Sequence, residues 1–176
     1  MKNSFNSLLW KFAILIGCFS LTSISCKKAF LYNLNEVRLE ENQKNLNAKN
    51  IQKIEAIRPL DTLKFILIGD SQRFYSELDD FVKEANGLKN IAFVALAGDI
   101  SDFGLSKEFQ WVNRKLTKLS MPYIAVIGNH DMLANGRKVY EQMFGAEDFT
   151  FTCNGNKFIC LNTNSREKGF DGSLPN

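Results

Sequence analysis

The chain has 176 residues, of which 45% are apolar and 12% aromatic, and its formal net charge is +3. This length allows one ordinary domain, and the apolar content excludes an intrinsically disordered chain. Residues 1–60 hold 9 Lys or Arg against 4 Asp or Glu, whereas residues 61–176 hold 13 against 15. Because the second part is faintly acidic, the sequence does not predict a nucleic-acid partner.

The first 26 residues resemble a bacterial export signal. Lys2 and Lys11 supply positive charge, and the apolar run FAILIGCFSLTSI is too short and too rich in Ser and Thr for a membrane-spanning helix. The run ends in SISCKK, which is similar to the processing site of bacterial lipoproteins, where the cysteine becomes the lipidated first residue. We therefore predict a signal peptide over residues 1–25 and an exported protein that a lipid on Cys26 anchors on the periplasmic or cell-surface side of a membrane. Two alternatives stay open, which are processing at Cys18 and plain secretion without a lipid.

The next segment is polar and rich in asparagine, and it closes at Pro59. Apolar residues recur loosely at helical spacing within it, so part of it can be helical. We interpret residues 26–60 as a tether between the membrane and the folded domain, which we place at residues 61–176.

From residue 61 the sequence alternates between two patterns. Near-continuous apolar runs predict buried strands at residues 62–70, 90–99 and 122–129. Helical spacing of apolar residues predicts helices at residues 74–87, 106–119 and 136–145. A period-two pattern over residues 148–163, with an Asn-Gly turn, predicts a β-hairpin. The order indicates an α/β fold in which a parallel strand-helix-strand-helix-strand unit precedes the hairpin.

Two cysteines, Cys153 and Cys160, flank the predicted hairpin turn. Export would permit a disulfide between them, because extracytoplasmic compartments are oxidising. Buried thiols in an apolar hairpin are the interpretation that we favour.

Each of the three predicted strands ends in a residue whose side chain carries an oxygen ligand, and a glycine precedes each of them. These residues are Asp70, Asp99 and Asn129, at intervals of 29 and 30 residues. Parallel strands bring their carboxyl ends to one edge of the sheet, which is where open α/β sheets bind ligands. Two carboxylates and a carboxamide gathered there would repel or stay unpaired without a cation among them. The pattern therefore predicts a metal site.

The three strand ends carry a specific set of motifs. GDSQ at 69–72, GDISDFG at 98–104 and GNHD at 128–131 resemble the first three motifs of the calcineurin-like metallophosphoesterase family. The family pattern is roughly Asp-x-His, then Gly-Asp-x-x-Asp-x-Gly, then Gly-Asn-His-Asp/Glu. The hairpin after the third motif is also similar to that of many members, so the resemblance spans about residues 61–165. It implies the first half of an α/β/β/α sandwich and the hydrolysis of a phosphorylated small molecule or other phosphate ester.

The resemblance also implies a metal centre. The family holds two divalent ions, of the Mn, Fe, Zn or Mg class, with a shared hydroxide as the nucleophile. By position in the motifs, Asp70 and Gln72 would bind the first ion, Asp99 would bridge both ions, and Asn129 would bind the second.

Two further residues take catalytic roles by the same resemblance. His130, the only histidine of the chain, would contact the substrate phosphate and protonate the leaving oxygen. Asp102 would orient the imidazole and keep it protonated. Arg73 follows the first motif and could reach a phosphate, but we interpret it as a surface residue.

The chain departs from the family pattern in two ways. Gln72 stands where the first motif usually has a histidine, and an amide oxygen is a weaker ligand that suits harder metals. The family completes its site with later histidines that end in a Gly-His-x-His motif, and this sequence has no histidine after His130. We therefore expect residues 61–176 to be a domain that is incomplete at its C-terminus. The alternative is a degenerate, non-catalytic domain of the same fold that binds phosphate or a metal.

Overall fold

A computed structural model describes residues 36–164. The predicted signal peptide, Cys18 and Cys26 lie outside the described residues. Of the described residues, 37–164 belong to one compact unit. Within the described range, no helix is long and apolar enough to cross a bilayer.

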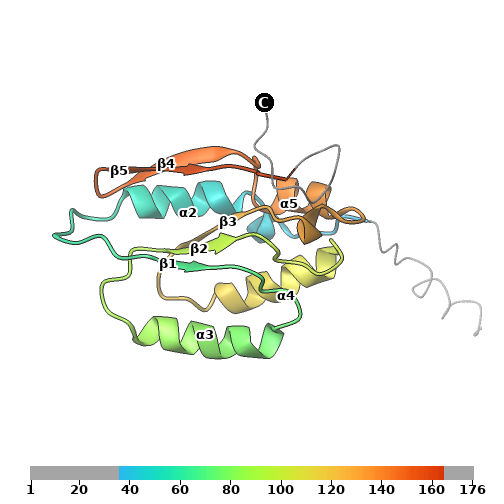
Figure 1. The fold of residues 1–176 in the computed structure, drawn as a ribbon, viewed down its shortest axis with the longest axis horizontal. Helices are drawn as coiled ribbons and strands as arrows, with labels where there is room; N and C mark the ends of the chain where they lie inside the picture. The colour runs from blue at the N-terminus through green and yellow to red at the C-terminus, as the bar shows by residue number, and fades with distance from the viewer. Residues whose placement is uncertain (1–35, 165–176) are drawn as a thin grey trace, which may run out of the picture. The chain divides into compact units, whose positions relative to one another are not determined.

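The centre of the fold is a three-stranded parallel sheet in the order β1-β2-β3 (Figure 1). Its strands are β1 (Ile66–Ile68), β2 (Val94–Ala97) and β3 (Tyr123–Val126). Two helices connect them, α3 (Tyr75–Gly87) and α4 (Ser106–Leu116), and both lie on the same face of the sheet. The predicted strand-helix order is thus confirmed. The strands are apolar because β2 and β3 are buried in the sheet, whereas Leu67 of β1 is 65% exposed.

The sheet is followed by a short helical segment and a hairpin. They comprise η3 (His130–Met132), α5 (Gly136–Met143), β4 (Phe149–Cys153) and β5 (Asn156–Cys160). The hairpin is antiparallel, and its two turn residues, Asn154 and Gly155, both have positive φ, at 50° and 77°. Such angles at both positions are typical of the Asn-Gly turn that the sequence predicted. Cys153 and Cys160 are free thiols, and burial raises the pKa of both.

One helix comes from the segment that we interpreted as a tether. After a single 3₁₀ turn, η2 (Glu41–Gln43), helix α2 (Leu46–Glu55) lies along strand β3 on the side of the sheet that faces the hairpin (Figure 1). Asn47 and Asn50 donate from Nδ2 to the carbonyl oxygens of Ala125 and Tyr123, each at 2.8 Å. The tether interpretation of residues 26–60 is therefore corrected for α2, which belongs to the folded domain. In the sequence alone, the asparagines of α2 suggest a segment exposed to solvent. In the structure, the side-chain amides of Asn47 and Asn50 form hydrogen bonds with the backbone of the edge strand β3.

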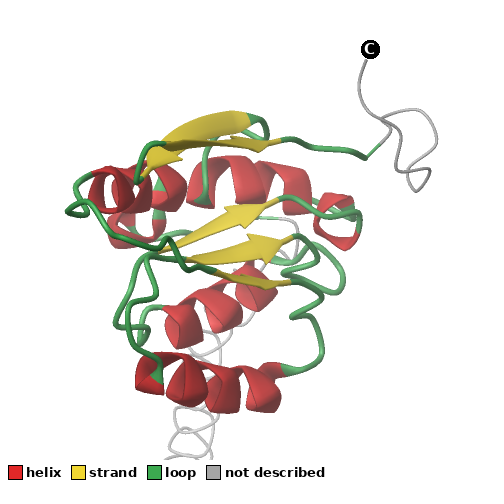
Figure 2. Cartoon of the chain, turned by 60° about the vertical axis from the view of Figure 1, so that its left-hand side comes forward, coloured by secondary structure: helices red, strands yellow, loops and turns green. Residues whose placement is uncertain are grey.

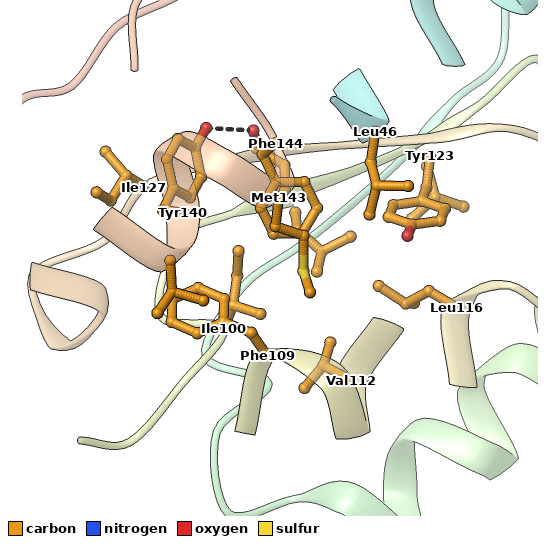
Figure 3. Packing of buried hydrophobic residues seen from close by; sticks show 14 of the residues in the cluster. Leu46, Ile100, Phe109, Val112, Leu116, Tyr123, Ile127, Tyr140, Met143 and Phe144 are labelled. Carbon is orange, nitrogen blue, oxygen red and sulfur yellow. Dashed lines mark hydrogen bonds between the residues drawn. The ribbon is translucent and has the colours of Figure 1, made fainter. Parts of the chain in front are cut away.

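Two apolar clusters hold these layers together. The larger one lies between the sheet and helices α3, α4 and α5, and includes Phe109, Val112 and Met143, each at most 1% exposed (Figure 3). The smaller one joins the sheet to the hairpin through Phe93, whose ring meets that of Phe158 edge-on at a centroid distance of 5.2 Å. Since the two clusters pack on opposite faces of the sheet, both help to fix the strands whose carboxyl ends carry the candidate site.

Candidate functional site

The carboxyl ends of the three strands lie together at one edge of the sheet (Figure 2). The backbone N–H of Asp70 donates to the carbonyl of Gly98 at 3.3 Å, and that of Gln72 donates to the carbonyl of Asp99 at 3.1 Å. Gly128 packs so closely that a methyl group on its Cα would overlap the backbone nitrogen and Oδ1 of Asp99. The loops after β1, β2 and β3 therefore meet as the parallel topology predicted.

Three residues in these loops have an unusual backbone. Asp70, Arg73 and Asp99 have φ values of 52°, 65° and 53°, in the left-handed region that favours glycine. A non-glycine residue held there costs free energy and often marks a functional position. Aspartate and arginine thus stand here at positions that glycine would fill more easily.

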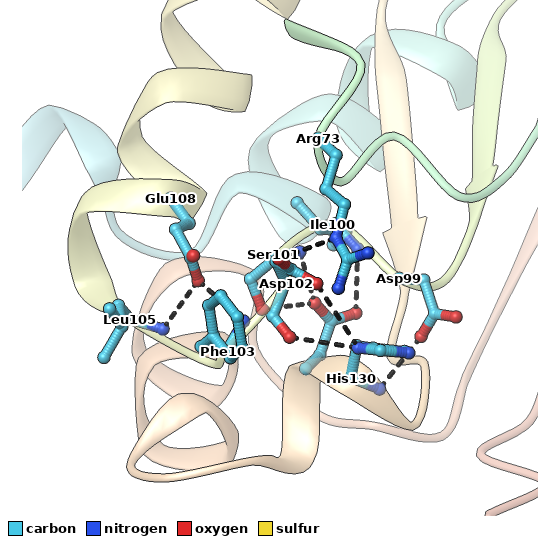
Figure 4. A network of polar contacts seen from close by, with 10 residues as sticks. Arg73, Asp99, Ile100, Ser101, Asp102, Phe103, Leu105, Glu108 and His130 are labelled. Carbon is cyan, nitrogen blue, oxygen red and sulfur yellow. Dashed lines mark hydrogen bonds and ion pairs between the residues drawn. The ribbon is translucent and has the colours of Figure 1, made fainter.

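His130 is joined to both aspartates of the second motif (Figure 4). Its backbone N–H donates to Oδ1 of Asp99 at 3.0 Å, and its ring Nδ1 lies 3.0 Å from the carbonyl oxygen of Asp102. A carbonyl oxygen can only accept, so Nδ1 carries the proton of this bond and Nε2 is the ring nitrogen left for other contacts. The side chain is 31% exposed, which leaves the imidazole accessible to a ligand.

Asp102 orients the imidazole differently from the expected arrangement. Its backbone carbonyl makes the hydrogen bond to His130, whereas its carboxylate Oδ1 lies 3.8 Å from Nδ1. The other carboxylate oxygen, Oδ2, accepts a hydrogen bond from Nε of Arg73 at 2.8 Å. This bond holds the pKa of Asp102 below its ordinary value, although burial acts in the opposite direction. The carboxylate thus lies between the guanidinium of Arg73 and the imidazole of His130, and Arg73 is its closer partner.

Asp131 is a site residue to which sequence analysis gave no role. Its fully buried carboxylate accepts four hydrogen bonds, from the backbone N–H groups of Ile100 and Gly128 to Oδ2 and from the N–H and Oγ of Ser101 to Oδ1. Burial raises its pKa to about 6, against the opposing effect of these bonds. Asp131 therefore fastens the loop after β2 to the loop after β3. Its place directly after the histidine of the third motif was the available signal.

Glu108 holds the same loop from its other end (Figure 4). Its Oε2 accepts hydrogen bonds from the backbone N–H groups of Phe103 and Leu105, at 3.0 and 3.1 Å. The segment that contains Asp102 is therefore fixed on both sides, by Asp131 before it and by Glu108 after it. Such support restricts the positions that Asp102 and His130 can take.

Gln72 presents an oxygen atom that suits a cation. Its Oε1 is buried and has no hydrogen-bond partner among residues 36–164. A buried amide oxygen without a partner is costly, and a metal ion would satisfy it. Asp70, Asp99 and Asn129 on the adjoining strand ends also carry oxygen ligands, the kind that hard divalent ions such as Mg²⁺ prefer.

Acidic, histidine and cysteine side chains alone do not make a metal site in the described part of the chain, since no group of three or more of them is suitably placed. A metal ion at the strand ends would therefore depend on the amide oxygens of Gln72 and Asn129 as well as on the two aspartates. In type, two carboxylates and two amide oxygens are ligands that hard divalent ions accept.

Comparison with protein families gives one match. Residues 63–173 match the family model described as calcineurin-like phosphoesterase. The matched range covers more than half of the chain and includes all three strand-end motifs. Neither the curated proteins nor the solved structures that were searched gave a match.

Proposed function

Because the chain belongs to the calcineurin-like phosphoesterase family, we propose that it hydrolyses a phosphate ester at the carboxyl ends of β1, β2 and β3, with a divalent metal ion as cofactor. The observation that carries this proposal is the position of His130, which is bound through its backbone to Asp99 and through its ring to Asp102. One strand-end carboxylate and the single imidazole of the chain are thereby held side by side. This is the combination that phosphate-ester hydrolysis needs.

The proposed metal ligands are the four strand-end side chains. Asp70, Gln72, Asp99 and Asn129 would hold the ion, and the buried, unpartnered Oε1 of Gln72 supports this assignment. When bound, a divalent ion supplies an activated water molecule and neutralises charge on the phosphate oxygens. The family resemblance implies two ions, whereas this all-oxygen set suits one hard ion best.

His130 supplies the proton that the reaction requires. With Nδ1–H donated to the carbonyl of Asp102, Nε2 is free to face the leaving oxygen of the ester. The reacting form is the imidazolium, in which both ring nitrogens carry a proton. As the bond between phosphorus and the leaving oxygen breaks, the Nε2 proton passes to that oxygen, and the ring is left as the neutral imidazole with its proton on Nδ1. Asp102 and Asp131 act as positioning residues, because they fix the ring and the loop beneath it.

The test is to purify the full chain, supply Mg²⁺ or Mn²⁺, and assay an activated aryl phosphate. Asp99→Ala should abolish metal binding and turnover together. His130→Ala should keep metal binding but lower the turnover rate by about 10²–10⁴, the usual contribution of a positioned general acid. Unchanged turnover in the His130 variant would exclude the acid role.

A binding function is the second candidate, and the composition of the ligand set favours it. An all-oxygen set without histidine binds weakly and is poor at acidifying water. A degenerate domain would bind phosphate or one metal ion but show no turnover above that of Asp99→Ala. The same assay therefore separates the two functions.

We further propose that the protein is exported and anchored through a lipid on Cys26, on the support of the SISC sequence and the apolar run before it. Cys26→Ala should move the mature protein from the membrane fraction to the soluble fraction. Cys18→Ala is the matched control and should leave it in the membrane. Equal partitioning of the wild type and the Cys26 variant would rule out the anchor.

A further inference from the structure

Arg73 shares Asp102 with the imidazole of the site (Figure 4). It lies in the loop after β1, and its Nε donates to Oδ2 of Asp102 at 2.8 Å. The backbone carbonyl of the same aspartate holds His130 Nδ1 at 3.0 Å. One residue thus fixes an arginine and a histidine next to the strand ends. The sequence interpretation of Arg73 as an ordinary surface residue does not account for this arrangement.

The hydrogen bond to Asp102 leaves most of the guanidinium group unused. A guanidinium has five N–H donors, and within the described part of the chain only Nε of Arg73 makes a hydrogen bond. The side chain of Arg73 is 65% exposed, whereas that of Asp102 is 10% exposed. The guanidinium group of Arg73 is therefore held at Nε, and its two Nη atoms are left for other contacts.

The backbone of Arg73 indicates that this placement serves more than an ion pair. Its φ of 65° lies in the left-handed region, which costs free energy for a side chain other than glycine. An ion pair with one exposed partner contributes little to stability, so it does not by itself offset the cost of this backbone conformation. A requirement for a positive charge at this point would explain the arginine.

The ligand chemistry follows from the charges around the site. Asp70, Asp99 and Asp102 would repel an anionic ester unless cationic groups face it. The planar guanidinium matches two phosphate oxygens at once, which makes arginine well suited to a phosphate group. We propose that Arg73 binds the phosphate group of the substrate through its Nη atoms, from a position that Asp102 fixes. This inference rests on the proposed function for the identity of the anion.

Binding of inorganic phosphate tests the inference without relying on turnover. Calorimetric titration of the full chain, with Mg²⁺ supplied, should show that Arg73→Gln weakens phosphate binding by about tenfold to a hundredfold, as expected for loss of charged hydrogen bonds. Arg73→Lys should recover part of the loss, because it keeps the positive charge but not the planar guanidinium that can bind two phosphate oxygens at once. Arg58→Gln is the matched control, since Arg58 is exposed and precedes β1, whereas the site lies beyond its carboxyl end.

A double variant separates phosphate binding from a structural role. If Arg73 acts only through Asp102, then Arg73→Gln should weaken phosphate binding no further in an Asp102→Asn background. If it contacts phosphate, the loss should persist in that background. Phosphate binding that is insensitive to Arg73→Gln, or no phosphate binding by the wild type, would overturn the inference.

The two proposals fail in different ways. If the protein shows turnover but Arg73→Gln does not change phosphate binding, the phosphoesterase function stands and the role of Arg73 is excluded. Phosphate binding that depends on Arg73 in a protein without turnover would keep the anion site and support the binding function instead.

Discussion

Asn47 makes two hydrogen bonds to the backbone of Ala125, donating from Nδ2 to its carbonyl oxygen at 2.8 Å and accepting its N–H on Oδ1 at 2.9 Å. The side-chain amide thereby takes the place of a peptide group in a neighbouring strand. Asn50, one helical turn later, donates to the carbonyl of Tyr123. Helix α2 therefore closes this edge of the sheet with side chains, and an unpaired strand edge is a site of unwanted pairing between chains.

Replacing Asn47 by alanine should lower the free energy of unfolding by about 2–3 kcal/mol, because the buried N–H of Ala125 loses its acceptor. The carbonyl of Ala125 keeps the Tyr140 hydroxyl as a donor at 2.7 Å, which limits the loss. Urea denaturation provides the measurement. Gln52→Ala, on the exposed side of α2, is the control and should change stability by less than about 0.5 kcal/mol. Equal stability of the Asn47 variant and the wild type would show that α2 is not docked on β3.

Gly128→Ala should abolish metal binding and turnover. The added methyl group would overlap the backbone nitrogen and Oδ1 of Asp99, so the loop after β2 must move. Gly87→Ala is the control, because a methyl group there meets nothing within 4 Å. Elemental analysis of bound metal checks the outcome. A Gly128 variant that loads metal normally would contradict the close packing of these two loops.

Asp131→Ala should destabilise the protein by about 3–5 kcal/mol, since it leaves several buried donors without an acceptor. Asp131→Asn should cost less, because it keeps one of the two oxygens that receive hydrogen bonds from the loops. Thermal denaturation and urea denaturation would each measure the stability of the wild type and of the two Asp131 variants. Asp148→Asn would serve as a charge-matched control. A loss below about 1 kcal/mol for Asp131→Ala would mean that the two loops hold together without it.

The ion pair between Arg73 and Asp102 should make stability depend on pH in the acid range. The hydrogen bond from Arg73 lowers the pKa of Asp102 in the folded state. A carboxyl group whose folded pKa lies below its unfolded value stabilises the fold above the unfolded pKa, at about 3.9, and loses that effect as the pH falls through the folded pKa. The stability difference between the wild type and Arg73→Met should therefore shrink between pH 7 and pH 3. A difference that is constant across this range would show that the pair makes no pH-dependent contribution.

The sequence predicted the order and type of the elements because their patterns are local. The apolar runs at residues 62–70, 90–99 and 122–129 became β1, β2 and β3, each shorter than predicted. The last residues of each run are not part of the strand, since the chain turns sharply there. At Asp70 and Asp99 that turn takes a left-handed backbone, which a sequence pattern does not reveal.

The parts that the sequence missed depend on contacts between distant residues. Asn47 and Ala125 are 78 positions apart, so the pattern of α2 alone indicated a solvated segment. The gathering of the strand ends could be predicted, because parallel topology requires it. The pairing of Arg73 with Asp102 could not, because it depends on a local loop conformation. The place of Asp131 in the third motif marked it, but the four donors around it come from three different residues and could not be read from its neighbours.

The docking of α2 also has a consequence for the order in which the protein is assembled. During synthesis, Asn47 and Asn50 emerge well before their partners, which lie 78 and 73 positions later in the chain. A helix of ten residues is too short to persist alone in water. Helix α2 therefore gains its stabilising contacts only after β3 has joined the sheet. The first helix in residues 36–164 thus depends on contacts that form only with later parts of the chain.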